Sequence, residues 1–143
     1  MTVRMILAHK GNDVVTIEPG APLSAVVETL AARRIGALVV TGAERRIVGI
    51  ISERDVVCAL AEHGAAALER PVAEMMTRKV VTCSECDTIA DLMERMTRSK
   101  FRHVPVVEQD RLAGIVSIGD VVRHRVEEME RDAAALHNYI QTA

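Results

Sequence analysis

A nine-residue stretch occurs twice in the chain, as GIISERDVV at residues 49–57 and as GIVSIGDVV at residues 114–122. Both copies keep Gly, Ser and Asp at the same places, while the residues between them vary. An internal repeat limits the possible folds strongly, because each copy is expected to form the same supersecondary unit. The chain is therefore expected to contain two equivalent halves.

The repeat continues into two amphipathic segments, PLSAVVETLAARR at residues 22–34 and TIADLMERMTRSK at residues 88–100. In both segments the apolar residues recur at i, i+3, i+4 and i+7, which predicts a helix with one buried face. These residues are Leu23, Val26, Val27 and Leu30 in the first segment and Ile89, Leu92, Met93 and Met96 in the second. The two segments are offset by 66 residues.

Short β-branched runs surround these helices in the same order in both halves. Residues 37–40 (ALVV) match 104–107 (VPVV), 46–52 (RIVGIIS) match 111–117 (RLAGIVS), and 13–19 (DVVTIEP) match 79–85 (KVVTCSE). Such runs predict buried strands. The first turn is two residues longer than the second, which a surface loop tolerates. Upstream, Val3, Ile6 and Leu7 match Val72, Met75 and Met76 as a short lead-in turn.

The sequence thus predicts an α/β (α+β) protein with two β-α-β-β-α repeats. The first module is expected at residues 1–62 and the second at 72–126, with an Ala-rich linker at 63–71 and an extension at 127–143. A unit of about 60 residues has little core of its own, and strands without alternation need cover on both faces. The halves should therefore pack together with pseudo-two-fold symmetry and leave a cleft where equivalent loops meet.

Composition argues against several classes of function. Net charge is −2, and Phe101 and Tyr139 are the only aromatic residues, so neither a polyanion footprint nor base-stacking platforms are expected. No apolar run reaches the ~18 residues of a membrane helix, no signal peptide is evident, and three cysteines do not suggest a disulfide framework. We expect a cytoplasmic protein without nucleic-acid or membrane partners.

The doubled pattern of helix, apolar strand, turn, G-I-h-S-x-x-D and helix resembles a tandem pair of CBS domains, the modules named after cystathionine β-synthase. The resemblance covers about 125 of the 143 residues. It implies a regulatory, non-enzymatic pair that binds AMP, ADP, ATP, NAD or S-adenosylmethionine in the cleft between its modules. It also implies pairing of two copies into a flat disc. No catalytic, transport or channel segment accompanies the repeats, so the chain resembles a stand-alone CBS pair.

Ser52 and Asp55 of the first copy, and Ser117 and Asp120 of the second, allow two roles that do not exclude each other. S-x-x-D between a strand and a helix is close to a capping box, in which Ser and the acid both bond to backbone N–H groups. A hydroxyl can also donate to a phosphate, and the helix N-terminus favours anions. A carboxylate would repel phosphate but accepts hydrogen bonds from a ribose diol. The resemblance assigns the same division of roles to these positions.

The two sites are expected to differ, because Arg102 and His103 precede the second VPVV run, whereas Ile35 and Gly36 stand at the matching positions. Lys79 and Arg54 are further candidate cations. We expect tighter binding around Ser117 and Asp120, with adenine against backbone and apolar groups and no aromatic clamp. The full set of expected ligand-binding residues is Lys79, Val80, Val81, Arg102, His103, Val104, Pro105, Ser117 and Asp120 in the second half, and Ala37, Ser52, Arg54 and Asp55 in the first.

Other readings of the chain remain open. Cys83 and Cys86 form a C-x-x-C motif without the further ligands that zinc needs, so no metal site is expected. We favour the interpretation that one of these cysteines is a buried thiol and the other a loop thiol; a redox sensor that uses both is the alternative. A hydrolytic triad would need the residue types of Ser117, His103 and Asp120. The sequence around Ser117 does not have the G-x-S-x-G motif of a nucleophile elbow, so catalysis and a catalytic cofactor are not expected. A scaffold that binds no ligand is the main rival to a sensor.

The C-terminal stretch from residue 121 lacks Pro and Gly and carries an apolar seam. Its members are Val122, Val126, Met129, Ala133, Leu136 and Ile140. Because this stretch extends about 15 residues beyond the repeat, we expect it to pack on a partner, most simply a second copy of the chain.

Overall fold

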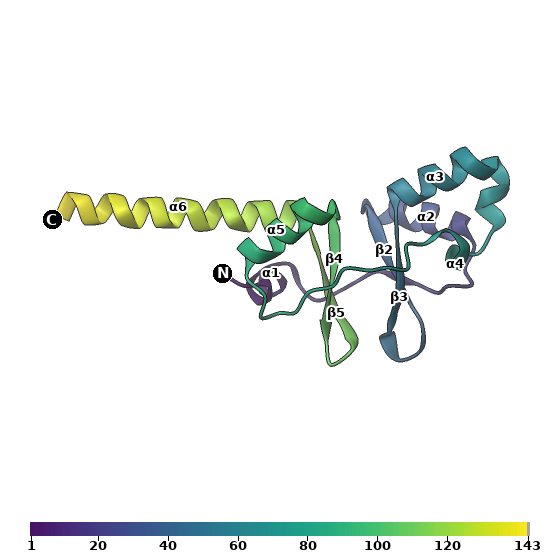
Figure 1. The fold of residues 1–143 in the computed structure, drawn as a ribbon, viewed down its shortest axis with the longest axis horizontal. Coiled ribbons are helices and arrows are strands. Elements are labelled where there is room, and N and C mark those ends of the chain that lie inside the picture. Colours follow the sequence, from purple (N-terminus) through teal and green to yellow (C-terminus); the bar gives the residue numbers. More distant parts are fainter. Residues whose placement is uncertain (143) are drawn as a thin grey trace.

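Two α/β modules lie side by side in the computed structural model, which describes residues 1–142, and a long helix projects from one of them (Figure 1). The first module holds the strands β1 (Thr16–Ile17), β2 (Ala37–Thr41) and β3 (Ile47–Ser52), and the helices α2 (Leu23–Arg33) and α3 (Glu53–His63). Strand β1 runs parallel to β2, and β2 runs antiparallel to β3. Short 3-10 turns η1 (Ala43–Arg45) and η2 (Gly64–Glu69) complete this half.

The second module repeats this arrangement with α5 (Ile89–Ser99), β4 (His103–Glu108), β5 (Arg111–Ser117) and α6 (Ile118–Thr142). The β4–β5 hairpin pairs His103 with Ser117, as β2–β3 pairs Ala37 with Ser52. His103 rather than Val104 is therefore the equivalent of Ala37, and the predicted match of residues 37–40 with 104–107 was wrong by one residue. Both hairpins carry a register irregularity in the same place, after Val40 and after Val106. The predicted α/β class is confirmed.

The predicted strands at 13–19 and 79–85 were too long. Only Thr16–Ile17 pairs in the first half, and the second half has a single parallel bridge between Cys83 and Val106. That bridge is held by Cys83 N, which donates to Pro105 O at 3.0 Å, and by Val107 N, which donates to Cys83 O at 2.8 Å. The residues before each pairing pass from one module to the other, so they have no neighbouring strand to bond.

The lead-in segments are exchanged between the modules. Helix α1 (Val3–Lys10) buries Val3, Ile6 and Leu7 in the core of the second module, and α4 (Val72–Met75) buries Val72 in the core of the first. Figure 1 shows α1 beside α5 and β5, and α4 beside α2 and β3, with two chain segments running between the modules. Each core is therefore built from residues far apart in the sequence, an exchange that the repeat alone did not reveal.

This exchange explains the glycine of the repeated G-I-h-S motif. A Cβ atom on Gly114 would lie 2.7 Å from Leu7 Cδ2, and one on Gly49 would lie 2.5 Å from Met76 Sδ and 3.0 Å from the carbonyl oxygen of Thr77. Both glycines thus lie where the crossing segment of the other half approaches β3 or β5. A larger residue would force that segment away from the strand.

Helix α6 extends well beyond the second module. Val121 and His124 near its start are buried, whereas residues 129–142 are all exposed. Among residues 1–142, no helix combines the length and the apolar character that crossing a bilayer would need.

Candidate functional site

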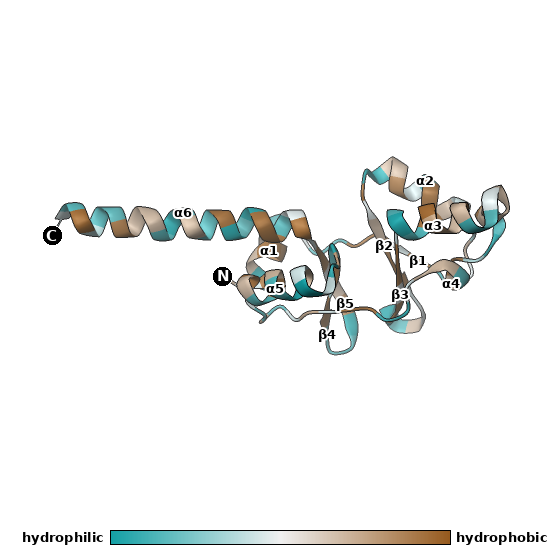
Figure 2. Cartoon of the chain, turned by 45° about the horizontal axis from the view of Figure 1, so that its top comes forward, coloured by the Kyte–Doolittle hydropathy of each residue, from teal (hydrophilic) through white to brown (hydrophobic). Residues whose placement is uncertain are grey.

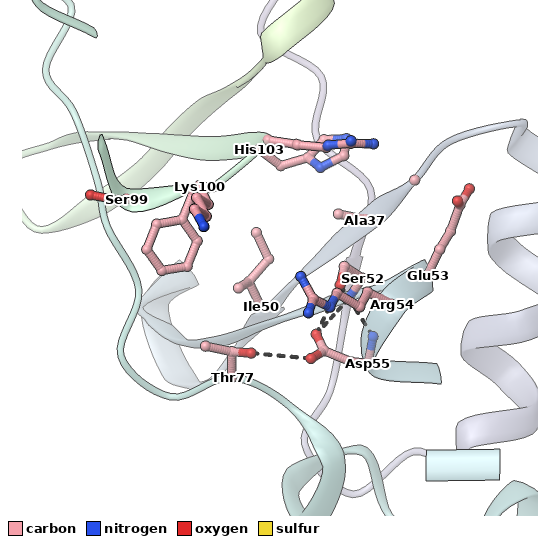
Figure 3. A pocket seen from close by; sticks show the side chains of 13 residues that line it. Ala37, Ile50, Ser52, Glu53, Arg54, Asp55, Thr77, Ser99, Lys100 and His103 are labelled. Carbon is pink, nitrogen blue, oxygen red and sulfur yellow. Dashed lines mark hydrogen bonds between the residues drawn. The ribbon is translucent and has the colours of Figure 1, made fainter. Parts of the chain in front are cut away.

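A cavity of ≈ 520 Å³ lies between the modules and is lined from both of them. Figure 3 shows Ser52, Arg54 and Asp55 on one side and Lys100 and His103 on the other. The lining residues are Gly36, Ala37, Ile50, Ser52, Glu53, Arg54, Asp55, Thr77, Ser99, Lys100, Phe101, Arg102 and His103. We call this space the first cavity. Its volume is within the range of small-molecule sites.

Ser52 and Asp55 form a capping box where β3 ends and α3 begins. The Asp55 amide donates to Ser52 Oγ at 3.3 Å, and the Ser52 amide donates to Asp55 Oδ2 at 2.9 Å. Ser52 Oγ also donates to Asp55 Oδ2 at 3.1 Å, and Thr77 Oγ1 donates to Asp55 Oδ1 at 3.3 Å. The cap fixes the carboxylate at the edge of the first cavity. Of its roughly four lone-pair positions, one on Oδ1 is left without a protein donor among the described residues.

Three cationic side chains line the same cavity. Lys100 follows α5 in a left-handed conformation (φ 60°), Arg102 precedes β4, and Arg54 lies in the first turn of α3. Within residues 1–142 none of the three forms an ion pair, although Glu53 and Asp55 are nearby in the lining. The cavity therefore offers unpaired positive charge on several sides of one acceptor carboxylate.

His103 lies at the contact between the modules. A Cβ atom on Gly36 would lie 3.1 Å from His103 Cε1, so the ring packs directly against the first module. Burial lowers the pKa of His103, and the Glu53 carboxylate opposes this shift only in part. The imidazole is therefore mainly neutral at pH 7 and supplies hydrogen-bonding groups rather than charge.

A second cavity, of ≈ 390 Å³, contains the equivalent pair Ser117 and Asp120. The same capping bonds are present: the Asp120 amide donates to Ser117 Oγ at 3.2 Å, and the Ser117 amide donates to Asp120 Oδ2 at 3.0 Å. The other lining residues are Lys10, Asp13, Val14, Val15, Arg34, Ile35, Gly36, Ala37, His103 and Ile115. The two cavities are thus built from equivalent positions of the two halves.

Asp120 is already paired with cations of its own chain. Lys10 Nζ lies 2.8 Å from Asp120 Oδ2 and donates to the carbonyl oxygen of Ile115 at 3.0 Å, and Arg123 lies 3.2 Å from Asp120 Oδ1. Burial raises the pKa of Asp120, but the hydrogen bonds from Lys10 and from the Ser117 backbone outweigh it, so the pKa lies below its usual value. A diol approaching Asp120 would have to compete with these two cations.

Replacing Lys10 by alanine is expected to raise the pKa of Asp120 and to destabilise the fold by about 1 kcal/mol at pH 7, the range of a partly exposed ion pair. Because the folded-state pKa of Asp120 is lowered, its contribution to stability is present above the unfolded-state value and disappears as the pH falls through the folded-state pKa. The difference in unfolding free energy between the unaltered protein and Lys10→Ala should therefore become smaller at acidic pH. Lys79→Ala, at an exposed lysine, is the matched control; an equal effect of both variants would contradict the ion-pair account.

The structure corrects the expected grouping of the site residues. Arg102 lines the first cavity, with Ser52 and Asp55, rather than the cavity of Ser117. Only its backbone lies near the second motif, where the Arg102 carbonyl accepts from the Ile118 amide at 2.7 Å. His103 and Ala37 line both cavities, and Arg54 lines the first.

Five other expected residues line neither cavity. Val104 and Pro105 are buried in β4, Lys79 is exposed, and Val80 and Val81 are partly buried in the crossing segment. Val14 and Val15 take the expected place of Val80 and Val81 beside Ser117, because the exchange brings the first crossing segment to the second module's motif. Arg102 and Lys79, the cations expected beside Ser117, thus do not line its cavity.

Sequence reasoning also missed residues that the structure brings to the site. Thr77, Lys100 and Phe101 line the first cavity, and Lys10 lines the second. Phe101 places one aromatic residue in the lining of the first cavity; the absence of an aromatic clamp around adenine stays a prediction. The matching apolar triplets upstream of each half could have indicated that Thr77 and Lys10 lie near the cavities. These triplets were interpreted as turns, whereas they belong to helices that pack on the other module.

The paired cysteines, the Ser117, His103 and Asp120 set and a metal site are the other candidates for chemistry. Burial, followed by the Asp87 carboxylate, raises the pKa of the Cys83 thiol to about 12, while Cys86 is exposed. One buried thiol and one loop thiol were the favoured interpretation of C-x-x-C, and this is confirmed. In the described part of the chain, no hydrogen bond joins His103 to Ser117, and no cluster of three acidic, His or Cys side chains is arranged to hold a metal ion.

The sequence matches the family model of the CBS domain twice, at residues 7–62 and 72–127. Among curated relatives, the mitochondrial CBS domain-containing protein CBSX3 of Arabidopsis thaliana is 34% identical over 119 residues, covering 80% of this chain and 58% of that protein. An uncharacterized 17.7 kDa protein of Acidianus ambivalens is 32% identical over 111 residues, covering 77% of this chain and 66% of the relative. The chain thus spans less than two thirds of the length of these relatives.

Solved structures share most of this fold. The CBS-domain containing protein ATU1752 of Agrobacterium tumefaciens is 50% identical, with a TM-score of 0.84, over 87% of this chain and 99% of that one. The CBS domain pair of protein MJ0100, solved in complex with 5′-methylthioadenosine and S-adenosyl-L-methionine, is 26% identical, with a TM-score of 0.79, over 90% of this chain and 98% of that one.

Proposed function

Because the chain belongs to the CBS-domain family and carries two such modules, we propose that it is a non-enzymatic regulatory module that binds an adenine nucleotide in the first cavity. The observation that carries this proposal is the lining of that cavity. An acceptor carboxylate, a serine and three unpaired cations surround a space of ≈ 520 Å³.

Different groups of lining residues suit the ribose, the phosphate and the adenine of a nucleotide. The free lone pair on Asp55 Oδ1 accepts a hydrogen bond from a ribose hydroxyl, and Thr77 on the same oxygen helps to fix its direction. Arg54, Lys100 and Arg102 provide charge-assisted hydrogen bonds for phosphate oxygens. The ring of Phe101 and the side chain of Ile50 give adenine an apolar contact.

The relative solved with bound ligands supports an adenosine-containing ligand as the class. S-adenosylmethionine and methylthioadenosine carry no phosphate, whereas three cations without acidic partners favour a phosphate-bearing ligand here. AMP, ATP and NAD are therefore the ligands that we propose for the first cavity. The second cavity should bind more weakly, because Lys10 and Arg123 already bond to the carboxylate oxygens of Asp120.

The rival functions have less support. A thiol sensor requires a thiolate, and the raised pKa of Cys83 keeps that thiol protonated at neutral pH. A scaffold without ligand gives no role to the three exposed cations that line one cavity. A cytoplasmic location and pairing with a second copy stay part of the proposal; they rest on the sequence and on the surface of α6 described below.

A thermal-shift panel tests the proposal. AMP, ATP, NAD, S-adenosylmethionine and adenosine should be compared, each nucleotide beside its 2′-deoxy analogue, under reducing conditions. A ligand present at about 100 times its Kd adds roughly 2.7 kcal/mol to stability, so the phosphate-bearing ribonucleotides should raise the melting temperature most. No shift with any of these compounds would favour the scaffold, and turnover of any of them would favour an enzyme.

A further inference from the structure

Helix α6 leaves the body of the protein without any neighbour along its second half. Its buried residues, Val121 and His124, are near its start, and every residue from 129 to 142 is exposed. Figure 1 shows the helix extending away from both modules. An isolated helix as short as residues 129–142 is marginally stable in water, so a partner along this projecting part would stabilise it.

Six exposed apolar residues of α6 follow a strict heptad spacing. They are Val122, Val126, Met129, Ala133, Leu136 and Ile140, at successive intervals of four, three, four, three and four residues. In heptad terms, Val126, Ala133 and Ile140 occupy a, and Val122, Met129 and Leu136 occupy d. We call these six residues the α6 seam. Figure 2 shows apolar residues recurring along the whole helix.

The α6 seam is available to a partner. Val126 is 46% exposed, Met129 54%, Leu136 61% and Ile140 64%. The residues that face the module, Val121 and His124, belong to a different stripe of the helix. The seam therefore continues without interruption from the module to the end of the described chain.

We propose that two copies of this chain associate through the α6 seam as a parallel, in-register, two-stranded coiled coil. β-Branched residues at a with Leu at d favour two parallel strands; Val126 and Ile140 occupy a, and Leu136 occupies d. In this alignment Arg125 at g, which also pairs with Glu128 of its own helix, faces Glu130 at e of the partner copy, an attractive pair. The seam thus complements itself in both shape and charge, and the inference does not depend on ligand binding.

The mass of the full chain in solution, measured by light scattering after gel filtration, tests this association. The unaltered protein should have twice the mass of one chain. Leu136→Glu should have the mass of a single chain, because it places a charge in the seam of both copies. Ala134→Glu, on the other side of the same helix, is the matched control and should stay a dimer. Since Leu136 is exposed in the single chain, neither substitution removes a contact within the modules, so both variants should still unfold cooperatively. Ala134→Glu should keep the helical circular dichroism signal of the unaltered protein, whereas Leu136→Glu should lose part of it, because the projecting half of α6 is then left without a partner.

Disulfide cross-linking tests the alignment. In a Cys58→Ser/Cys86→Ser background, which removes the two exposed thiols, Ile140→Cys should form a disulfide-linked dimer, because a parallel in-register pair places residue 140 opposite its copy. An unaltered protein of single-chain mass would overturn the proposal. A dimer that survives Leu136→Glu would also overturn it, by placing the association elsewhere, and a dimer without the Ile140→Cys cross-link would overturn the parallel alignment.

Discussion

Ile6→Ala is expected to lower the free energy of unfolding by about 2–5 kcal/mol, the range for truncating a fully buried aliphatic side chain. Ile6 has 0% exposure and packs in the core of the second module, although it precedes the first module in the sequence. The exchange of α1 and α4 is therefore a source of stability for both modules. Urea unfolding followed by circular dichroism measures the effect.

Met5→Ala is the matched control on the same helix. Met5 is 45% exposed, so its truncation should change stability by no more than about 0.5 kcal/mol, as for other surface positions. If Ile6→Ala were as mild as Met5→Ala, α1 would not belong to the core of the second module. The crossing of the lead-in segments, and with it the grouping of residues around each cavity, would then be wrong.

Asp55→Asn is expected to weaken AMP binding by about 10- to 100-fold, corresponding to the roughly 1.5–3 kcal/mol of a hydrogen bond to a charged group. An asparagine oxygen can still accept from the Ser52 amide and so keep part of the helix cap, but the variant loses the carboxylate charge and one oxygen acceptor. Isothermal titration calorimetry gives the affinity directly, which separates it from any loss of stability through the cap.

The same titration with 2′-deoxy-AMP identifies the group that Asp55 contacts. The unaltered protein should bind 2′-deoxy-AMP more weakly than AMP, and this difference should shrink in Asp55→Asn. Asp110→Asn, in the exposed turn between β4 and β5, removes an equal charge and should bind AMP as the unaltered protein does. If the Asp55→Asn and unaltered proteins bound AMP with equal affinity, the Asp55 carboxylate would not contact the ribose.

The repeat made much of the fold predictable. Apolar spacing located α2 and α5, the β-branched runs located the hairpins, and the S-x-x-D motif located both helix caps, because all of these depend on residues close together in the sequence. The second hairpin is the shorter one, as predicted, but by one residue rather than two, because Ala37 pairs with Ser52 and His103 with Ser117. Gln109 and Asp110 in its turn both have positive φ, as a two-residue hairpin turn requires.

The exchange between the halves was not predictable from the repeat. A duplicated sequence has the same internal pattern whether each lead-in segment packs on its own module or on the other, and Val3, Ile6 and Leu7 are equally apolar in both cases. The difference lies in contacts about a hundred residues apart, such as that of Leu7 with Gly114. The sequence also grouped Arg102 with Ser117, although it lines the first cavity, and did not identify Lys100 as a lining residue, while the identity of the capping residues was correct.

Backbone amide NMR spectra recorded during a titration with AMP show whether an adenine nucleotide binds in the first cavity. We expect chemical-shift changes concentrated at residues 50–55, at Thr77 and at residues 99–103, with smaller changes around Lys10 and Asp120 at higher concentration. Spectra that stay unchanged at millimolar AMP, or changes confined to the surface groove of Thr16–Ala21 and Thr41–Ala43, would contradict this expectation.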